Sequence, residues 1–571
     1  MDSFNNALSA INAILWHNYV LFAIVLVGLV FTLWTGFCQF RSLTHGFAVV
    51  RGKYDDPNDP GAISHFQALS AALSATVGLG NIGGVALAIA LGGPGAVFWM
   101  WVIGLIGMAI KFTEVTLSML YRNTDDPDNP HGGPMWVAAQ GLARRSPSLA
   151  GLGRAIGVVF CVTLLISTTT GGNMFQAWNV AEITRTYFGV PGIVSGVVLA
   201  TLVGLVIIGG IKRIGRVAGT LVPFMVAMYL IAGTYVLFVN ADQIPAMFGM
   251  IFRHAFSPTE AAGAFMGGTV GFAILVGLKR ALFSNEAGQG SSPIAHSAAK
   301  TDEPVREGVV AGLEPFIDTI VVCTFTALVI LSSGVWNRGA EVMLPDVPRV
   351  VPVELGQWTV PDTALPARER GDWIDGNQVF MIFEGDMNAN TGNRRQRIAG
   401  TIFTESNRKL VRFDTVASDT RPVLNDLGIY ASYVGASLTA RAFDTAADGL
   451  GKYLVTIASW LFALSTMISW SYYGEQGMVF LAGKKAVLPY KFAFLLLAVI
   501  ATTGFLRTDT ELDNFTGFGN AVMLFANIPI CCLFGYQAVR AYKDYFARLK
   551  SGALDRNEPA PTLDELLGDK T

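Results

Sequence analysis

Stretches of predominantly apolar residues recur along the whole chain, and their length constrains the fold more than any other feature. A helix needs about 20 such residues to cross the hydrocarbon core of a bilayer. By this measure the sequence predicts eleven spans: 14–36, 65–91, 95–120, 155–181, 191–211, 217–239, 261–283, 308–333, 452–473, 489–506 and 515–539. A soluble fold is excluded because only 14% of the 571 residues are charged, whereas 52% are hydrophobic. We therefore expect an all-α polytopic membrane protein.

Lysines and arginines are unevenly divided between the loops on the two sides of the predicted membrane. One side, which includes the C-terminal tail, carries most of them, whereas the short loops on the other side carry only Arg185, Arg253 and Arg507. Basic loops remain in the cytoplasm. The sequence therefore predicts an extracytoplasmic N-terminus and a cytoplasmic C-terminus. The net charge of −2 gives no basic field that would attract nucleic acid.

The segment 336–450 departs from the membrane pattern because it is polar and contains only short apolar or alternating runs, such as 379–383 and 410–413. Short runs of this kind, separated by turn sequences, are typical of β-strands. We expect a small, mostly β extracytoplasmic insertion between the eighth and ninth spans. The predicted membrane domain then comprises 1–335 and 451–545, and 546–571 is a cytoplasmic tail.

Two predicted spans are interrupted by glycine near their middle. Residues 73–84 read LSATVGLGNIGG, and residues 267–277 read GGTVGFAILVG. Such sequences are poor helices, and unwound backbone survives in a membrane only where protein or a cavity covers it. The two segments lie five spans apart, so the last ten spans divide into two sets of five with opposite orientation, the first over 65–239. This pattern is typical of inverted-repeat transporters, although glycines also occur where helices pack closely.

A broken helix supplies polar groups without a charged side chain. Amides at the N-terminus of a half-helix attract a carboxylate, and free carbonyls coordinate a cation. We therefore predict a site at membrane mid-depth, formed by the backbone of 77–81 and 269–273. No residue of 73–84 is charged, which argues against a proton relay through carboxylates in this segment.

Neutral polar residues also lie at membrane depth. Asn173 and Gln176 share one helical face, and each either lines a pocket or forms hydrogen bonds between helices. Ser465 and Thr466 are adjacent in the ninth span, and their hydroxyls either bind a hard cation such as Na⁺ or bond to their own helix.

The charged residues at membrane depth fall into two pairs. Lys111 and Glu114 lie three residues apart and predict a charge-compensated structural pair near the cytoplasmic end of the third span. Glu314 and Asp318 lie four residues apart and need a positive partner, such as the basic pair at 279–280. A gating network and a catalytic carboxylate pair both remain open for them. The six His and five Cys have no metal-ligand or disulfide spacing.

Several longer motifs occur in one order along the chain. They are 77–81 (VGLGN), 92–101 (GGPGAVFWMW), 132–136 (GGPMW), 284–290 (SNEAGQG), 299–302 (AKTD) and 469–475 (SWSYYGE). Together they resemble the alanine/glycine:cation symporter family, and the resemblance covers all eleven spans. It implies a LeuT-type 5+5 inverted repeat plus one N-terminal helix, placed in the bacterial inner membrane. The loop at 336–450 departs from the family, whose members have a shorter loop there.

The resemblance also implies a function and roles for individual residues. The function is Na⁺-coupled symport of alanine, glycine and similar small neutral amino acids into the cell by alternating access, with no cofactor. Backbone amides near Leu79 and Gly80 would receive the substrate carboxylate. The implied Na⁺ ligands are the carbonyls of Ser74 and Val77 and the hydroxyls of Ser465 and Thr466. The other implied pocket residues are Thr76, Asn81, Asn173, Phe175, Gln176, Thr269 and Trp470.

Two other functions are compatible with the sequence. A receptor or sensor built on a transporter scaffold would use 336–450 as its ligand-binding domain and could bind an unknown extracytoplasmic partner there. A membrane-embedded enzyme would use Glu114, Glu314 and Asp318, but no nucleophile–base pair accompanies them, so we do not expect an enzyme. The expected partners are therefore the amino acid, Na⁺ and the membrane lipids.

Overall fold

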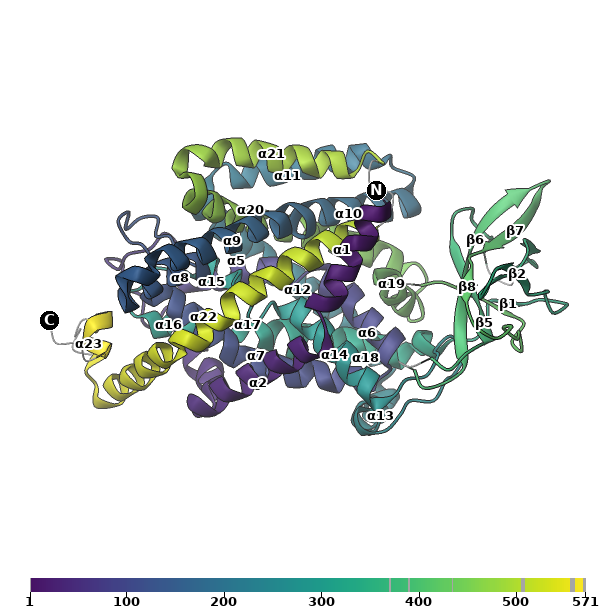
Figure 1. Cartoon of the computed structure of the whole chain (residues 1–571), viewed down its shortest axis with the longest axis horizontal. Coiled ribbons are helices and arrows are strands. Elements are labelled where there is room, and N and C mark those ends of the chain that lie inside the picture. The colour runs from purple at the N-terminus through teal and green to yellow at the C-terminus, as the bar shows by residue number, and fades with distance from the viewer. Residues whose placement is uncertain are drawn as a thin grey trace.

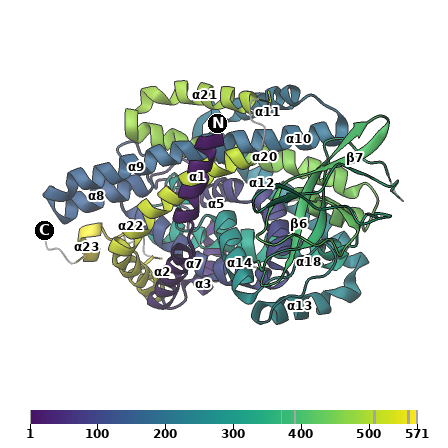
Figure 2. The ribbon, with the colours of Figure 1, turned by 45° about the vertical axis from the view of Figure 1, so that its right-hand side comes forward.

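The structure, a computed structural model, describes residues 2–368, 371–388, 391–433, 435–504, 509–554 and 560–567. It consists of a long body of helices with β-strands gathered at one end (Figure 1). The C-terminal helix α23 lies at the opposite end of this body, and a view turned by 45° shows the same arrangement (Figure 2). Arg507 and parts of the predicted tail, 555–559 and 568–571, lie outside the described residues.

The helices follow one another along the chain with short breaks, and η marks the short 3₁₀ or π segments among them. The first half contains α1 (Asp2–Leu15), α2 (Asn18–Trp34), α3 (Cys38–Arg41), η1 (Ser42–Gly46), α4 (Phe47–Val50), α5 (His65–Thr76), η2 (Gly80–Gly84), α6 (Val85–Gly92), α7 (Gly95–Leu120), α8 (Pro134–Arg145), η3 (Pro147–Leu149), α9 (Ala150–Thr169), η4 (Thr170–Met174), α10 (Phe175–Phe188), α11 (Gly192–Ile207), α12 (Gly210–Val239), η5 (Ala241–Gln243) and α13 (Ile244–Phe256).

The second half contains α14 (Val270–Asn285), α15 (Ser292–His296), α16 (Pro304–Ala311), α17 (Leu313–Pro315), η6 (Phe316–Cys323), α18 (Thr324–Ser333), η7 (Val335–Asn337), α19 (Ala436–Asp444), α20 (Leu450–Ala482), η8 (Lys484–Ala486), α21 (Val487–Ala501), α22 (Asp509–Ser551) and α23 (Leu563–Leu567). The strands are β1 (Val342–Met343), β2 (Val351–Glu354), β3 (Gln357–Thr359), β4 (Thr363–Ala364), β5 (Gln378–Glu384), β6 (Arg395–Glu405), β7 (Arg408–Phe413), β8 (Val416–Ala417) and β9 (Gly428–Ala431).

Seven helical stretches among the described residues are long and apolar enough to cross a membrane, and the bent pair α5 and η2–α6 adds an eighth. The sequence predicted eleven spans. The other three predicted spans contain α11, α14 and α21, which have 16, 16 and 15 residues. At 1.5 Å per residue these helices are about 22 to 24 Å long, shorter than a hydrocarbon core of about 30 Å.

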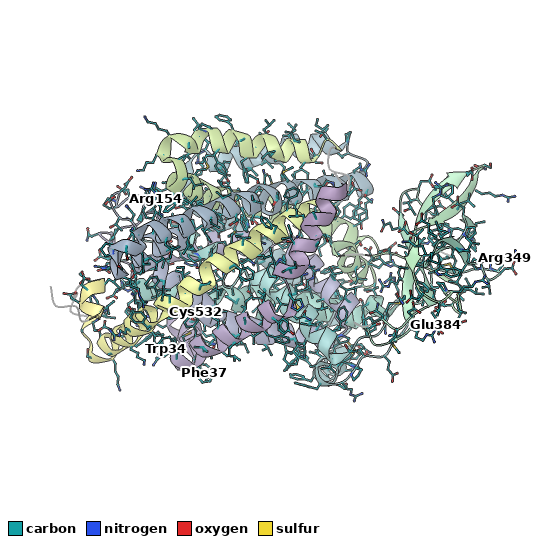
Figure 3. All side chains as sticks on the ribbon, viewed as in Figure 1. Trp34, Phe37, Arg154, Arg349, Glu384 and Cys532 are labelled. Carbon is teal, nitrogen blue, oxygen red and sulfur yellow. The ribbon has the colours of Figure 1, made fainter. Side chains whose placement is uncertain are left out.

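Large apolar side chains cover the outside of the helical body. Trp34 and Phe37, labelled in Figure 3, are 43% and 50% exposed, and Phe238 is 80% exposed. Soluble proteins rarely leave so much apolar surface in contact with water. A surface of this kind is typical of helices that contact lipid.

The first predicted interruption is present in the structure. Helix α5 begins with a capping box, in which Ser64 and Gln67 each bond to the other's backbone amide. It ends at Thr76, and the helix that follows is bent by 52° relative to it. The glycine-rich sequence therefore breaks this span where it was expected to.

The seventh predicted span differs from its prediction. Instead of an interruption at 267–277, an irregular segment at 257–269 leads into α14, which runs unbroken from Val270 to Asn285. Gly277 fits within this helix because α7 packs closely against it, so that an added Cβ would lie 2.4 Å from the carbonyl oxygen of Ala96. Close packing is therefore the correct explanation for Gly277. Gly267 lies before the helix at a φ of +82°, which favours glycine.

All strands of the described residues lie between Val342 and Ala431, inside the segment 336–450. They form two antiparallel sheets, with strand orders β1-β9-β5-β6-β7-β4 and β2-β3-β8. Helix α19 also belongs to 336–450, but it packs against α18, α20 and η2 of the helical body. Thr439 of α19 donates a hydrogen bond to the carbonyl oxygen of Ile82, 2.9 Å away, so this helix contacts the broken span directly.

The sheets also contact the helical body ahead of α14. Asn393, which precedes β6, donates a hydrogen bond from its amide to the carbonyl oxygen of Met266. Arg397 of β6 donates from Nη2 to the carbonyl oxygen of Ala264 at 2.5 Å. The strand-bearing segment is therefore attached to the loop that leads into α14.

Candidate functional site

The break after α5 frees one backbone carbonyl from helical hydrogen bonding. In an unbroken helix the amide of Gly78 would donate to the carbonyl of Ser74, four residues earlier. Here that amide donates to Oδ1 of Asn81 at 2.7 Å instead. The Ser74 carbonyl oxygen is therefore available to groups outside α5.

Two hydroxyls of α20 use this carbonyl. Thr466 donates from Oγ1 to the Ser74 oxygen at 3.2 Å. Oγ of Ser465 lies 3.4 Å from the same oxygen and also donates within its own helix, to the carbonyl of Phe462 at 2.9 Å. In the other direction, the Ser74 hydroxyl donates to the carbonyl of Ser465 at 2.7 Å. Three of the four residues predicted as Na⁺ ligands therefore meet at one point, and Val77, the fourth, is a fully buried residue three positions after Ser74.

The chemistry of this cluster suits a small monovalent cation. Its oxygens are neutral, hard ligands, and they come from two different helices. Within the described parts of the chain, no group of three or more His, Cys, Asp or Glu residues could hold a metal ion. Carbonyl and hydroxyl oxygens of this kind are the ligands that hard cations prefer.

Open space lies next to the break. Gly80 is exposed, and an added Cβ at this position would meet no atom within 4 Å. Gly78 is more restricted, since a Cβ there would lie 3.2 Å from Oγ1 of Thr466. A small ligand beside Gly80 would thus lie close to the cluster formed by Ser74 and Thr466.

Asn81 contacts residues that the sequence reasoning did not include in the site. Its Nδ2 donates to Oδ1 of Asp318 at 2.5 Å and to Oγ of Ser284 at 3.0 Å. Asp318 also accepts hydrogen bonds from Ser284 at 2.7 Å and from Thr319 at 2.8 Å. Ser284 opens the SNEAGQG motif, which was the one sequence signal that could have identified it.

Thr269 lies away from this cluster. It caps the N-terminus of α14 by accepting a hydrogen bond from the amide of Phe272, whereas Ser284 lies near the other end of the same helix. Fifteen residues of helix separate the two by about 22 Å. A Cβ on the neighbouring Gly268 would lie 3.8 Å from the carbonyl oxygen of Leu91, so Thr269 lies near the end of α6.

The remaining predicted pocket residues lie around the π segment η4 and near the end of α5. Asn173 donates to the carbonyl of Phe494 at 2.6 Å, so its amide faces α21. Gln176 donates to the carbonyl of Gly171 at 3.0 Å, and Phe175 beside it is half-buried. The Asn173 bond is of the interhelical kind that the sequence left open, whereas the Gln176 bond is local to its own helical segment. Trp470 packs on Gly172, where an added Cβ would lie 2.4 Å from its ring, and the Thr76 hydroxyl bonds back to its own helix.

The sequence comparisons with known proteins agree on one family. The sequence model of the sodium:alanine symporter family matches residues 1–361 and 415–559. The sodium/alanine symporter AgcS of Methanococcus maripaludis is 36% identical over 500 residues, which cover 88% of each chain. The probable sodium/glutamine symporter GlnT of Bacillus subtilis is 36% identical over 70% of this chain and 77% of its own length. The amino-acid carrier protein AlsT of Bacillus subtilis is 29% identical over 97% of this chain and 94% of its own length.

Proposed function

This chain belongs to the sodium:alanine symporter family, and from that premise we propose that it carries alanine, glycine and similar small neutral amino acids into the cell together with Na⁺. Family membership makes the chain a multi-pass membrane protein and a sodium-coupled amino-acid transporter. The family and its named relatives are symporters rather than enzymes. The small substrate and the route of transport are the proposed part.

The observation that carries the proposal is the meeting of Ser74, Ser465 and Thr466 at the break in the first broken span. Na⁺ bound at these oxygens, and at the carbonyl of Val77, would lie beside the exposed backbone of Gly80. A substrate carboxylate at the amides of Leu79 and Gly80 would then lie close to the ion, so that each would strengthen the binding of the other. Alternating access would expose this site to each side of the membrane in turn.

The proposed substrate pocket keeps Thr76, Leu79, Gly80 and Asn81 at its centre. Asn173, Phe175, Gln176 and Trp470 lie around η4 and would form its far wall. Thr269 would act only from a distance, because it caps α14 near the end of α6. The absence of a side chain at Gly80 favours a small amino acid such as alanine or glycine over glutamine.

The arrangement of the spans in the membrane is also part of the proposal. Eleven spans would form a LeuT-type 5+5 inverted repeat plus one N-terminal helix in the bacterial inner membrane, with α11, α14 and α21 as the shorter spans. Basic loops place the C-terminus in the cytoplasm and the N-terminus outside. The strands of 336–450 lie at the end of the molecule opposite to α23, which supports an extracytoplasmic position for them (Figure 1).

Reconstitution into proteoliposomes tests the proposal. We expect uptake of labelled alanine and glycine to need an inward Na⁺ gradient, to carry net charge, and to fail when K⁺ replaces Na⁺. Labelled glutamine serves as the larger competitor. Full alanine uptake driven by a pH gradient without Na⁺ would refute the proposed coupling, and stronger competition by glutamine than by glycine would refute the proposed size limit.

A further inference from the structure

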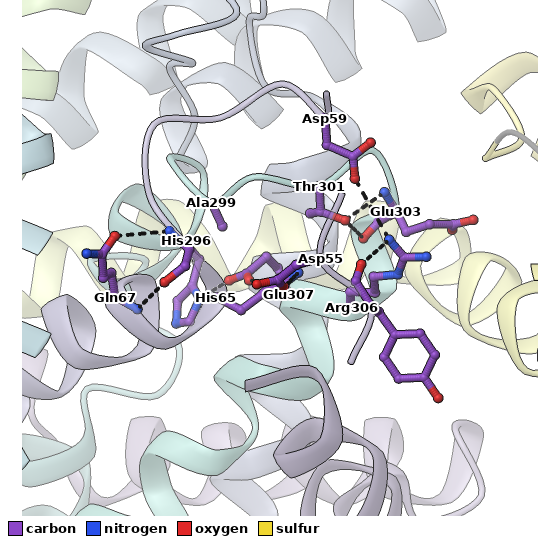
Figure 4. Close-up of polar contacts among 12 residues, drawn as sticks. Asp55, Asp59, His65, Gln67, His296, Ala299, Thr301, Glu303, Arg306 and Glu307 are labelled. Atoms are coloured by element: carbon purple, nitrogen blue, oxygen red, sulfur yellow. Dashed lines mark hydrogen bonds and ion pairs between the residues drawn. The ribbon is translucent and has the colours of Figure 1, made fainter. Parts of the chain in front are cut away.

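A continuous series of titratable side chains runs through the helical body, apart from the proposed transport site. Its members are Asp55, His65, Glu307, His296, Glu314, Lys111 and Glu114. Asp55 is the exposed end, with 46% of its side chain accessible, and its Oδ1 lies 3.8 Å from Nε2 of His65. From His65 to Glu314 every side chain is at most 1% exposed. Figure 4 shows Asp55, His65, Glu307 and His296 converging at this place.

The contacts along the series alternate between acid and base. Nδ1 of His65 contacts Oε1 of Glu307, and Oε2 of Glu307 contacts Nδ1 of His296. Nε2 of His296 lies 2.8 Å from Oε1 of Glu314. Glu314 reaches Lys111 at 3.3 Å, so Lys111 and His296 are both positive partners of Glu314.

His296 is bonded to carboxylates through both ring nitrogens. A neutral imidazole has one N–H donor, whereas a protonated imidazole has two. His296 can therefore donate to both Glu307 and Glu314 only when it is protonated, although Glu314 also accepts from Ser292 at 2.5 Å and Glu307 also contacts His65. Burial alone would lower the pKa of His296, but the two carboxylates outweigh burial and raise it from 6.5 to about 9.

Other titratable groups on neighbouring elements also act on this pair of carboxylates. Helix α7 supplies Lys111 and Glu114, and Arg122 just after it acts on Glu307. Glu286, from the turn before α15, and Tyr473 of α20 are both close enough to Glu314 to interact with it electrostatically. Lysine and arginine ordinarily hold their protons to higher pH than histidine does, so we expect His296 to lose its proton before Lys111 or Arg122 on alkalinisation.

His65 connects this series to the proposed transport site. It is the first residue of α5, and α5 ends at the break beside Ser74, about 17 Å away. The break after Thr76 separates α5 from the helix that follows, so a movement of α5 would not have to bend a continuous helix. The first turn of α5 is held by the contact of His65 with Glu307. Just before this turn, Ile63 forms a backbone β-bridge with Ala299, a residue that lies shortly after α15.

We propose that His65, Glu307, His296 and Glu314 form a proton-binding clamp that holds α5 in place. Protons reach the clamp through Asp55, and the clamp releases α5 when His296 loses its proton. When His296 is neutral, it donates to only one of the two carboxylates. The positive charge between Glu307 and Glu314 is then lost, so the two buried negative charges repel each other. Release of Glu307 frees His65 and with it the first turn of α5. The clamp would set the pH at which the broken span moves. Its role in transport rests on the proposed function.

Thiol labelling of α5 tests the clamp without measuring transport. Ser70 lies on α5 and is only 3% exposed, so a cysteine there is protected while α5 is held. Ser406→Cys, in the exposed turn between β6 and β7, provides a water-exposed reference for the pH dependence of thiol chemistry, in a background with Cys532→Ser. The measured quantity is the labelling rate of Ser70→Cys divided by that of Ser406→Cys, in the full chain in detergent, at about pH 7 and about pH 10.

The clamp predicts opposite labelling ratios for two variants. In the otherwise unchanged chain we expect the ratio to rise at least about fivefold between the two pH values. His296→Gln offers only one donor group, so the ratio should be high at both pH values. Glu307→Gln can accept from one imidazole and donate to the other when both are neutral, so the ratio should be low at both pH values.

Each result decides the proposal. A ratio that does not change with pH in the unchanged chain, or that rises equally in Glu307→Gln, would overturn the clamp. If His296→Gln does not yield folded protein, Glu307→Gln still discriminates, because it keeps the volume and all hydrogen bonds of the site. Failure of alanine transport would contradict the proposed function. The labelling result could still be interpreted, because it does not depend on transport.

Discussion

The hydroxyl oxygen of Thr466 lies 3.2 Å from the backbone carbonyl oxygen of Ser74, although 392 residues separate them in the chain. Ser74 lies on α5, two residues before the break, and Thr466 lies in the middle of α20. Most buried threonines of this protein bond to their own helix, as Thr113 does with the carbonyl of Ala109 at 2.8 Å. Thr466 instead bonds across to another helix at the place where that helix is broken.

This difference makes Thr466→Val a sharp test of the proposed Na⁺ site. Valine keeps the volume of threonine and removes one oxygen. We expect apparent Na⁺ affinity to fall about 5- to 30-fold, which corresponds to about 1–2 kcal/mol for a lost contact to a charged group. Alanine affinity should fall with it at low Na⁺ and recover at high Na⁺, because coupling between two bound species is reciprocal. A Na⁺ titration of alanine binding measures both effects.

Thr113→Val is the matched control for that titration. It removes a buried hydroxyl that bonds only within its own helix, so any general effect of losing a threonine oxygen appears there too. Superimposable Na⁺ titrations for Thr466→Val and the unchanged protein would remove Thr466 from the site.

The space beside Gly80 gives a second prediction. Gly80→Leu would place a large side chain where no atom now lies within 4 Å, so the fold should tolerate it while the substrate cannot fit. We expect alanine binding to weaken more than about 100-fold with little change in thermal stability, because a bulky group occupies the ligand volume. Binding calorimetry and a thermal melt measure the two quantities.

A second glycine-to-leucine variant, placed away from the site, serves as the control. It measures the general cost of replacing glycine by leucine without filling the ligand space. Gly151, at the start of α9, is also exposed and also has open space around it, so Gly151→Leu should leave alanine binding unchanged. If Gly80→Leu bound alanine as well as Gly151→Leu does, the substrate pocket would lie elsewhere.

The first broken span could be predicted from sequence because its cause is local. Glycines and Asn81 in 73–84 weaken the helix by themselves, and the break appears where they occur. The second glycine-rich segment shows the limit of this reasoning. Gly277 belongs to an unbroken helix because Ala96 of α7 approaches it, and only the tertiary structure reveals that neighbour.

The candidate site could be predicted only in part for the same reason. Ser74, Ser465 and Thr466 contact one another in the structure, and only the resemblance to a known family suggested that they would. The contact of Asn81 with Asp318 joins residues 237 positions apart, and no pattern within one sequence specifies such a pair. The distance between Thr269 and the break likewise depends on where α14 begins, which is at Val270 rather than at 261, the start of the predicted span.

The sidedness of the strands gives a third prediction. Ser406 lies in the exposed turn between β6 and β7, and Ser551 lies exposed at the end of α22, toward the opposite end of the molecule. In a background with Cys532→Ser, Ser406→Cys should react with an impermeant thiol reagent in intact cells, because basic loops stay inside and the strands face outward. Ser551→Cys should react only after the membrane is opened. The reverse labelling pattern would invert the proposed topology.

The strands themselves give the last prediction, because they separate a transporter from a sensor. The family match omits 362–414, which carries β4 to β7, so these strands are absent from the shared framework. The two ends of this piece are close together, since β3 pairs with β8 and Trp358 lies opposite Val416. A short Asn-Gly link from Pro361 to Thr415 should therefore close a hairpin without strain in the rest of the chain.

Deletion of 362–414 with this link should leave Na⁺-driven alanine uptake within about threefold of the full chain, because the ion and substrate residues lie in the helical body. The deletion also removes the bonds of Asn393 to Met266 and of Arg397 to Ala264 ahead of α14. Asn393→Ala with Arg397→Ala in the full chain measures the effect of those two bonds alone. If the deletion abolished uptake while the double substitution left it intact, and the shortened protein still bound alanine, the strands would be an active part of the cycle. That result would favour the sensor function, in which a ligand bound to the strands controls the helical body.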